Sequence, residues 1–132
     1  MAFWGCTGLT GVFFRGNAPT TVGFQVFNTA PNVTVYYRPG TRGWFATFAG
    51  CLTVLWDPRI AVNDLSFGLR PNGFGFRITG TTNIPIVVEA STDLASAAWV
   101  PLQTASLTNG FFDFADPGWT NYAARFYRVR SP

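Results

Sequence analysis

A chain of 132 residues can bury one modest hydrophobic core or two very small ones. Hydrophobic residues make up 48% of the chain and charged residues only 11%, a composition that argues against disorder. The net charge of +3 comes from arginines spread between Arg15 and Arg130, without the dense basic stripe typical of nucleic-acid binding, so we expect no nucleic-acid partner.

The first expected elements belong to an internal repeat. Ala2-Phe3 corresponds to Val26-Phe27 at an offset of 24 residues, and residues 12–15 correspond to residues 35–38 at an offset of 23. A period of this size is the length of one leucine-rich-repeat coil, a strand plus a connecting arc that cannot bury its apolar side alone. We therefore expect strands of two successive coils, and a further strand of a cap, at residues 12–14, 33–37 and 53–56.

Turn sequences divide the rest of the N-terminal half. Residues 16–19 and 39–43 are typical of turns, and residues 43–49 are compatible with one short helix. Residues 1–58 are therefore predicted to hold the terminal coils and their cap. Residues 59–73 mix polar and apolar side chains without clear periodicity, and they are predicted to be a linker.

Short strands alternate with turns from residue 74 to the C-terminus, and this pattern predicts a small β-sandwich-like module over residues 74–132. Asn109-Gly110 is a strong signal for a β-hairpin between two of these strands. The expected fold is thus mainly all-β, with a leucine-rich-repeat-like half-solenoid cap followed by this module. The strands of the module are expected at residues 74–78, 84–91, 99–107, 111–114 and 124–130.

The residue types that carry most catalytic chemistry are missing. The chain has no His and no Lys, which removes Ser-His-Asp triads, His-liganded zinc sites and P-loops. We therefore predict no catalytic residue, no metal site and no cofactor. The alternative is a hydrolase that uses a carboxylate pair, Glu89 with Asp93 or Asp113 with Asp116. Turn sequences around Asp93 and Asp116 favour a structural role instead.

The candidate ligand-binding residues are Phe13, Arg15, Tyr36 and Arg38. Because side chains alternate along a strand, Phe13 points outward if its two neighbours point inward, and Tyr36 does the same one coil later. The two rings then lie side by side, edged by the arginine that follows each aromatic pair. Such a face could bind a carbohydrate, an anionic polymer or another protein; alternatively, it packs on a neighbouring part of a longer protein.

Several motifs resemble those of a known family. The run Ala-Phe-x-Gly-Cys-Thr-x-Leu-Thr at residues 2–10 resembles the hallmark of BspA-like leucine-rich repeats of bacterial surface proteins, and residues 32–44 are similar to the segment that closes such arrays. The family usually has Leu in place of Arg38 and a Gly-Arg-Pro-Thr-Val-Leu-Trp run in place of residues 50–56. Residues 76–128 resemble a β-rich module that often ends these proteins. The resemblance implies the C-terminal part of a secreted or cell-surface protein with a binding, adhesion or anchoring role, and it brings no catalytic motif.

Further expectations concern the environment of the chain. Cys6 and Cys51 allow one disulfide, which suits an extracellular parent, although Cys6 equally fits a small buried side chain of the repeat. No apolar run approaches the roughly 20 residues of a membrane helix, and repeat sequence follows Met1 directly in place of a signal peptide, so we expect any secretion signal to belong to a longer parent. The first coil, Met1 to Leu9, lacks a preceding coil to cover it, and this predicts self-association.

Overall fold

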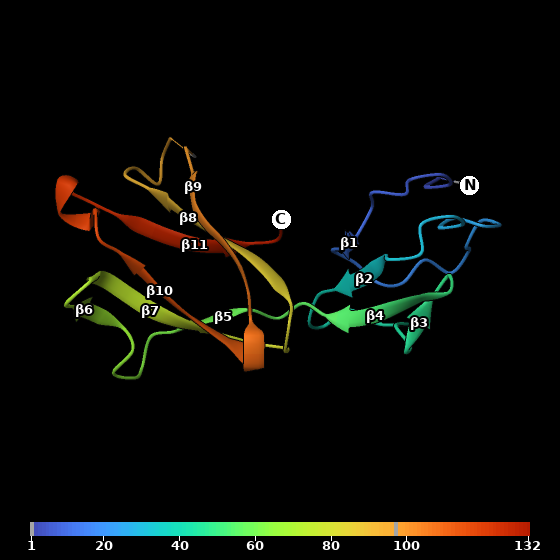
Figure 1. The fold of residues 1–132 in the computed structure, drawn as a ribbon, viewed down its shortest axis with the longest axis horizontal. Coiled ribbons are helices and arrows are strands. Elements are labelled where there is room, and N and C mark those ends of the chain that lie inside the picture. The colour runs from blue at the N-terminus through green and yellow to red at the C-terminus, as the bar shows by residue number, and fades with distance from the viewer. Residues whose placement is uncertain (1, 97) are drawn as a thin grey trace. The chain divides into compact units, whose positions relative to one another are not determined.

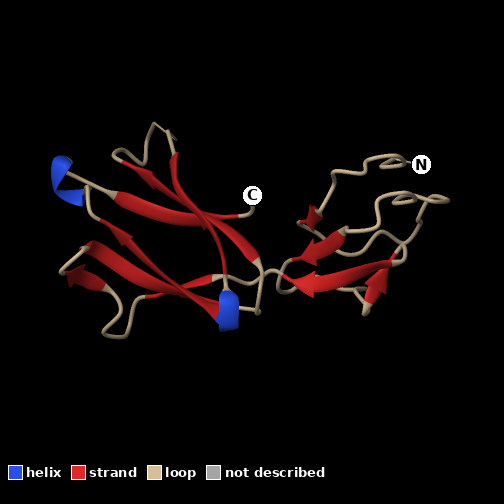
Figure 2. Cartoon of the chain, in the orientation of Figure 1, coloured by secondary structure: helices blue, strands red, loops and turns tan. Residues whose placement is uncertain are grey.

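The computed structural model describes residues 2–96 and 98–132, and it is built almost entirely of β-strands and loops (Figure 1). Strands hold 41% of the residues, and the described part of the chain contains no α-helix, only single-turn 3-10 segments (Figure 2). The predicted mainly β fold is therefore confirmed, and none of the described segments is an apolar helix long enough to cross a membrane. The chain divides into two compact units at Asp57 and Pro58.

A four-stranded sheet organises the unit of residues 2–57. Its order is β1-β2-β4-β3, with β1, β2 and β4 parallel and β3 antiparallel to β4 (Figure 1). The register places Val12 opposite Val35 and Phe13 opposite Tyr36, which is the 23-residue offset of the sequence repeat. The strands are β1 (Gly11–Phe14), β2 (Thr34–Tyr37), β3 (Thr47–Phe48) and β4 (Cys51–Leu55).

The segments that precede β1 and β2 are paired with one another as well. The amide of Phe3 donates to the carbonyl of Val26 at 3.0 Å, and the amide of Gly5 donates to the carbonyl of Asn28 at 3.3 Å. The ring of Phe3 stacks on that of Phe27 with centroids 5.4 Å apart and planes 6° from parallel. The spacing found in the sequence therefore holds around the connecting arc as well as along the strands.

The inner face of this sheet covers a small apolar core. Val35 is fully buried because it lies in the middle of the sheet, between Val12 of β1 and Thr53 of β4. The expected alternation is confirmed, since Val12 and Phe14 pack against this core. The buried members are Phe27, Ala30, Val33 and Val35, and the half-buried side chains around them are Phe3, Leu9, Val12, Phe14, Val26, Trp44, Phe48 and Cys51.

The expectation of a short helix at residues 43–49 is wrong. Thr47–Phe48 forms β3, which returns into β4 through a two-residue turn at Ala49 and Gly50, with φ of 50° and 84°. Positive φ at both central residues is the geometry of a tight β-hairpin, because its twist matches that of the flanking strands. The hairpin brings the ring of Phe48 to 5.6 Å from that of Phe14, so this segment adds to the core.

Two separate sheets form the unit of residues 58–132. In one, β7 pairs with β10 on one side and with β5 and β6 on the other; in the second, β8 lies between β9 and β11 (Figure 1). The ring of Tyr127 on β11 contacts Phe76 and Phe114 of the other sheet, with centroids 5.6 and 5.8 Å away. The strands are β5 (Arg59–Ala61), β6 (Gly68–Arg70), β7 (Gly73–Thr79), β8 (Pro85–Ser91), β9 (Val100–Ser106), β10 (Phe111–Asp116) and β11 (Phe126–Arg130).

The structure differs from expectation in residues 59–73, which were expected to link two domains. Arg59–Ala61 pairs antiparallel with one end of β7, and Gly68–Arg70 pairs with its other end. Both strands are only three residues long, too short for an alternating pattern to be recognised in the sequence. These residues therefore belong to the sheet of the second unit.

The expectation of a hairpin at Asn109-Gly110 is also wrong. Asn109 and Gly110 do turn tightly, with φ of 59° and 84°, but β9 pairs with β8 while β10 pairs with β7. Leu107 is fully buried, and its amide donates to the carbonyl of Ile84, which continues the pairing of β9 with β8 up to the turn. The turn therefore carries the chain from one sheet to the other.

Candidate functional site

The outer face of the first sheet carries a pair of stacked aromatic rings. Phe13 and Tyr36 lie opposite one another on β1 and β2, with ring centroids 4.6 Å apart and planes 12° from parallel. The predicted juxtaposition of these two rings is confirmed. Both side chains are half-buried, and a Cβ atom on Gly11 would lie 3.2 Å from the Tyr36 ring, so the neighbouring glycine leaves room for the stack.

Arg15 and Arg38 stand directly after the two strands, one position beyond the paired residues Phe14 and Tyr37. Both arginines are exposed, and neither guanidinium group has an ion-pair partner among the described residues. The loops that follow them are joined, because the amide of Arg42 donates to the Asn17 side chain at 2.9 Å. Phe13, Arg15, Tyr36 and Arg38 together are called the aromatic–arginine face below.

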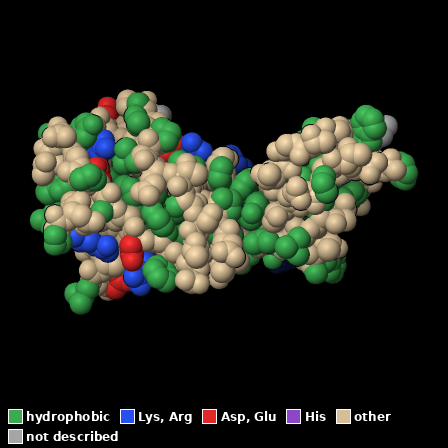
Figure 3. Space-filling model, viewed as in Figure 1, with side chains coloured by type: hydrophobic (Ala, Val, Ile, Leu, Met, Phe, Trp, Pro, Cys, Tyr) green, Lys and Arg blue, Asp and Glu red, His purple; other side chains and the backbone are tan. Residues whose placement is uncertain are grey.

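The charges of this unit are unbalanced. Residues 2–57 contain three arginines, Arg15, Arg38 and Arg42, and a single acidic residue, Asp57. On the face drawn in Figure 3, charged side chains gather over the other unit, and this one shows mainly apolar and uncharged polar groups. Because three arginines face a single acidic residue in this unit, their positive charge is only partly balanced. The aromatic–arginine face therefore has a positive potential.

The geometry of the stack decides which part of each ring is available. The rings face each other across neighbouring strands, so their faces point along the sheet and their edges point away from it. Trp56 also contacts the Phe13 ring, at 6.1 Å and nearly perpendicular. The two rings therefore offer little open face for a flat sugar ring. Aromatic edges carry the positive part of the ring quadrupole, which favours the same ligands as the guanidinium groups.

The carboxylates considered for catalysis accept hydrogen bonds from other groups of the chain. Glu89 is buried on β8, where it accepts hydrogen bonds from Arg128, at 2.7 Å, and from Arg130. Burial alone would raise the pKa of Glu89, but the hydrogen bonds from Arg130 and Arg128 outweigh it, and the pKa is lowered. Asp93 accepts the amide of Ala95 at 2.8 Å in an exposed turn. Glu89 therefore lacks the raised pKa of a general acid.

The other carboxylate pair is divided by the strand that carries it. Asp113 is exposed on one side of β10, whereas Asp116 is buried on the side of Phe114. Two hydrogen bonds from Arg77, at 2.9 and 2.8 Å, lower the pKa of Asp113. Asp116 accepts the amide of Gly118 at 2.9 Å, as its turn sequence predicted.

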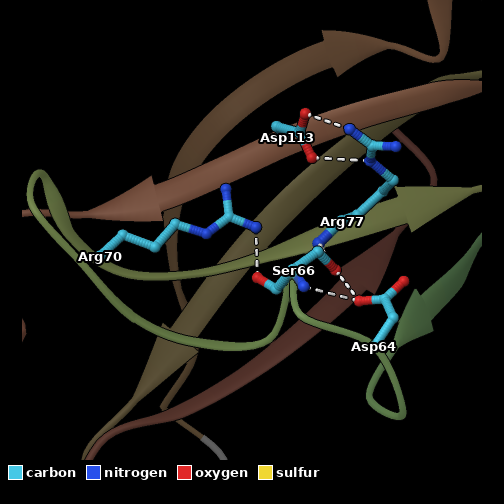
Figure 4. Close-up of polar contacts among 5 residues, drawn as sticks. All are labelled: Asp64, Ser66, Arg70, Arg77 and Asp113. Carbon is cyan, nitrogen blue, oxygen red and sulfur yellow. Dashed lines mark hydrogen bonds and ion pairs between the residues drawn. The ribbon is translucent and has the colours of Figure 1, made fainter.

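A polar network that the sequence did not reveal fixes the loop between β5 and β6 (Figure 4). Asp64 accepts the amide of Ser66 at 2.8 Å and also its hydroxyl, and these hydrogen bonds lower the pKa of Asp64. The Ser66 hydroxyl accepts the amide of Arg77 at 3.3 Å, while Arg70 donates to the Ser66 carbonyl. The network ties the loop to β7 and leaves Leu65 fully exposed. We interpret it as structural, because its acidic groups are satisfied by the chain itself.

The two cysteines are not bonded to one another. Cys6 is exposed in the first loop, in contrast to the buried position that the repeat suggested, and Cys51 is half-buried at the start of β4. Burial raises the pKa of the Cys51 thiol, which makes it less reactive as a thiolate. Within residues 2–96 and 98–132, no group of three or more Asp, Glu or Cys side chains is placed to hold a metal ion.

Comparison of the chain with protein-family models, with curated proteins and with solved structures gives no match.

Proposed function

We propose that the chain is a non-catalytic binding or adhesion module, the C-terminal part of a BspA-like leucine-rich-repeat protein at a bacterial cell surface. The pairing of β1 with β2 at a 23-residue offset supports this proposal, as does the pairing of Phe3 with Val26 in the arcs. Parallel strands joined by arcs that stack at the same interval are the construction of a repeat solenoid. The hairpin of β3 and β4 then serves as its cap, and residues 58–132 as the terminal β-sandwich-like module.

The ligand of this module is an anionic polymer, bound at the aromatic–arginine face. The observation that carries this assignment is the placement of Arg15 and Arg38 at equivalent positions of adjacent strands, beside the stacked rings and without an acidic partner among the described residues. Two like charges side by side repel each other, and an anion that contacts both removes the repulsion. Acidic polysaccharides present such groups repeatedly, which suits a site that repeats at the strand spacing of about 4.8 Å.

Binding to immobilised alginate, an acidic polysaccharide, tests the proposal. Arg15→Ala and Arg38→Ala should each weaken binding about tenfold, roughly 1.4 kcal/mol, because each removes one of two charge contacts. Tyr36→Ala should weaken it as well, since the stack fixes the face. Raising the salt concentration should reduce the affinity of the native chain, because exposed charges are screened.

Arg59→Ala is the matched control, because Arg59 is exposed on β5 and the substitution removes the same charge from the other unit. Neutral dextran is the control polymer. If Arg59→Ala weakens alginate binding as much as Arg15→Ala and Arg38→Ala do, binding follows net charge alone and the assigned face is wrong. Further repeats in frame upstream of the first codon would support the leucine-rich-repeat parent, and unrelated sequence there would contradict it.

The alternative function, a hydrolase, has a separate test. Glu89, Asp93, Asp113 and Asp116 are replaced singly by the corresponding amide, and glycoside hydrolysis is measured beside the folded state. Only an enzyme loses turnover in a variant that remains folded. Turnover by the native chain, abolished by one of these substitutions, would replace the proposal of a non-catalytic module.

A further inference from the structure

An aromatic pocket of about 240 Å³ lies in the second unit, between β7, β11 and the segment that precedes β11. Aromatic side chains form most of its wall, and one arginine is the charged group among them. Its lining residues are Phe74, Trp119, Tyr122, Ala123, Arg125 and Tyr127.

The chain builds this pocket from a single turn and two strands. Asp116 ends β10, and its side chain accepts the amide of Gly118 at 2.9 Å, which starts the 3-10 turn Trp119–Asn121. The turn places the ring of Trp119 6.4 Å from that of Phe74 on β7. Phe74 in turn stacks on Tyr127 of β11, with centroids 5.6 Å apart and planes 9° from parallel. Phe74 and Tyr127 are therefore held by strands β7 and β11, whereas Trp119 is placed by the turn that Asp116 starts.

The positive charge of Arg125 is neutralised by an ion pair with Asp116. Nε of Arg125 lies 3.0 Å from a carboxylate oxygen of Asp116, and the side chains of the two residues are only 12% and 7% exposed. The Tyr127 hydroxyl donates to the same oxygen at 2.9 Å. Burial, together with this hydrogen bond, raises the pKa of Tyr127 to about 12, so Tyr127 remains a neutral phenol at physiological pH. The pocket therefore carries no net charge.

The guanidinium group of Arg125 lies over an aromatic ring. Its central carbon lies 4.0 Å from the centroid of Tyr122, a side chain that is 44% exposed. The N–H of Nε is the donor to Asp116, and arginine carries further N–H donors in the same fixed plane. The pocket thus combines apolar ring surface with hydrogen-bond donors that are fixed in position.

We infer that this pocket binds one ring of a neutral carbohydrate. The apolar carbon atoms of the aromatic wall suit the C–H groups of a sugar, and the N–H donors of Arg125 suit its hydroxyl oxygens. The volume is smaller than the roughly 300–1,000 Å³ of pockets for drug-sized ligands, so it fits a single ring. Asp116 cancels the charge of Arg125, which removes the attraction for an anionic sugar. This site is separate from the aromatic–arginine face and differs from it in ligand charge.

The test uses the full chain and the methyl glycosides of glucose, galactose, mannose and N-acetylglucosamine. Saturation-transfer NMR should detect at least one of them, with a dissociation constant of about 1 mM, the range expected for one ring in a shallow pocket. The indole N–H resonance of Trp119, identified by its absence in Trp119→Phe, should shift during the titration. Methyl glucuronide, an anionic sugar, should bind more weakly than the neutral glycosides.

Tyr122→Ala should weaken glycoside binding at least tenfold, because it removes the ring against which Arg125 lies. Phe126→Ala is the matched control, since Phe126 is a similarly exposed aromatic on β11 outside the pocket, and it should leave binding unchanged. Amide spectra of both variants establish that they are folded. Arg15→Ala and Arg38→Ala should have no effect, which separates this inference from the proposed function.

The inference is overturned if none of the four neutral glycosides binds at about 10 mM. It is also overturned if methyl glucuronide binds more tightly than they do, or if folded Tyr122→Ala binds as the native chain does. Alginate binding that survives any of these results leaves the proposed function of the first unit intact.

Discussion

Glu89 shows how single residues of the second unit are held in place. Its carboxylate is buried on β8, and its two ion-pair partners, Arg128 and Arg130, extend from β11, which pairs with β8. The arginine side chains are 47% and 40% exposed, so solvent screens their side of the interaction. The two ion pairs therefore matter chiefly because they supply hydrogen-bond donors to a carboxylate that is buried away from water.

Glu89→Gln should destabilise the chain by about 1–2 kcal/mol, because the two guanidinium groups lose their anionic partner. Urea unfolding measures the change. Asp93→Asn, which removes the same charge from an exposed turn, should leave the midpoint nearly unchanged. Equal effects of the two substitutions would contradict a specific role for the buried ion pairs.

Glu89 also predicts how stability depends on pH. Its pKa in the folded chain is lowered below its ordinary value of 4.5. A carboxyl group of this kind stabilises the folded state fully above its unfolded pKa, and the contribution is lost as the pH falls through the folded pKa. The native chain should therefore lose stability below about pH 4.5, and Glu89→Gln should lose less. Parallel acid unfolding curves for the two chains would show that other groups dominate.

Gly73 is a position that only glycine can occupy. Its φ is +129°, and a Cβ atom there would lie 2.3 Å from the carbonyl oxygen of Asp116. Gly73→Ala should therefore destabilise the second unit by about 2 kcal/mol or more, because both the backbone angle and the contact with β10 are violated. Gly16→Ala is the control, since nothing lies within 4 Å of its Cβ position. Thermal melts of the two variants give the comparison, and equal melting temperatures would show that β7 and β10 can separate at low cost.

At the scale of the elements, the sequence predicts strands well where a repeat or a run of β-branched side chains marks them. Residues 12–14 and 33–37 are recognisable as strands because they repeat. Residues 84–91 are recognisable because β-branched side chains follow one another. The structure has a strand in each of these places. The stack of Phe13 on Tyr36 follows from alternation together with the repeat offset.

Elements that depend on distant partners were not predictable. β5 and β6 gain their hydrogen bonds from β7, and nothing in three residues signals that pairing. The turn at Asn109-Gly110 was recognised, but a local turn signal does not say which strands pair on either side of it. The aromatic pocket escaped notice for the same reason, because Phe74 meets residues 119–127 only through the pairing of sheets.

The pairing of β5 and β6 predicts where the second unit begins. A chain of residues 58–132 should fold alone, with dispersed amide resonances, because it contains both sheets. A chain of residues 74–132 should be much less stable, since it loses β5, β6 and the loop that Asp64 fixes. Small domains have little stability to spare. Equal stability of the two chains would restore the interpretation of residues 59–73 as a linker.

At the scale of the whole molecule, the charge is low and the exposed apolar surface considerable. The net charge is only +3, so electrostatic repulsion between copies is weak. β1 pairs with β2 on one side and has no second partner strand among the described residues. Trp4, in the first loop, is 56% exposed. An unpaired edge strand is a site at which a second copy can pair, and the exposed Trp4 ring adds apolar surface to the same unit.

The chain should therefore self-associate through β1 and the loop that precedes it. Light scattering should show a mass that rises with concentration, and Trp4→Ser should weaken the association about tenfold by removing apolar contact area. Phe45→Ser is the matched control, because Phe45 is a more exposed aromatic, at 79%, in the loop before β3, which is the opposite edge strand of the sheet. If both substitutions act alike, association follows exposed aromatic area in general and not the loop before β1. A monomer at about 1 mM would exclude self-association altogether, and β1 would then be protected by its short length of four residues.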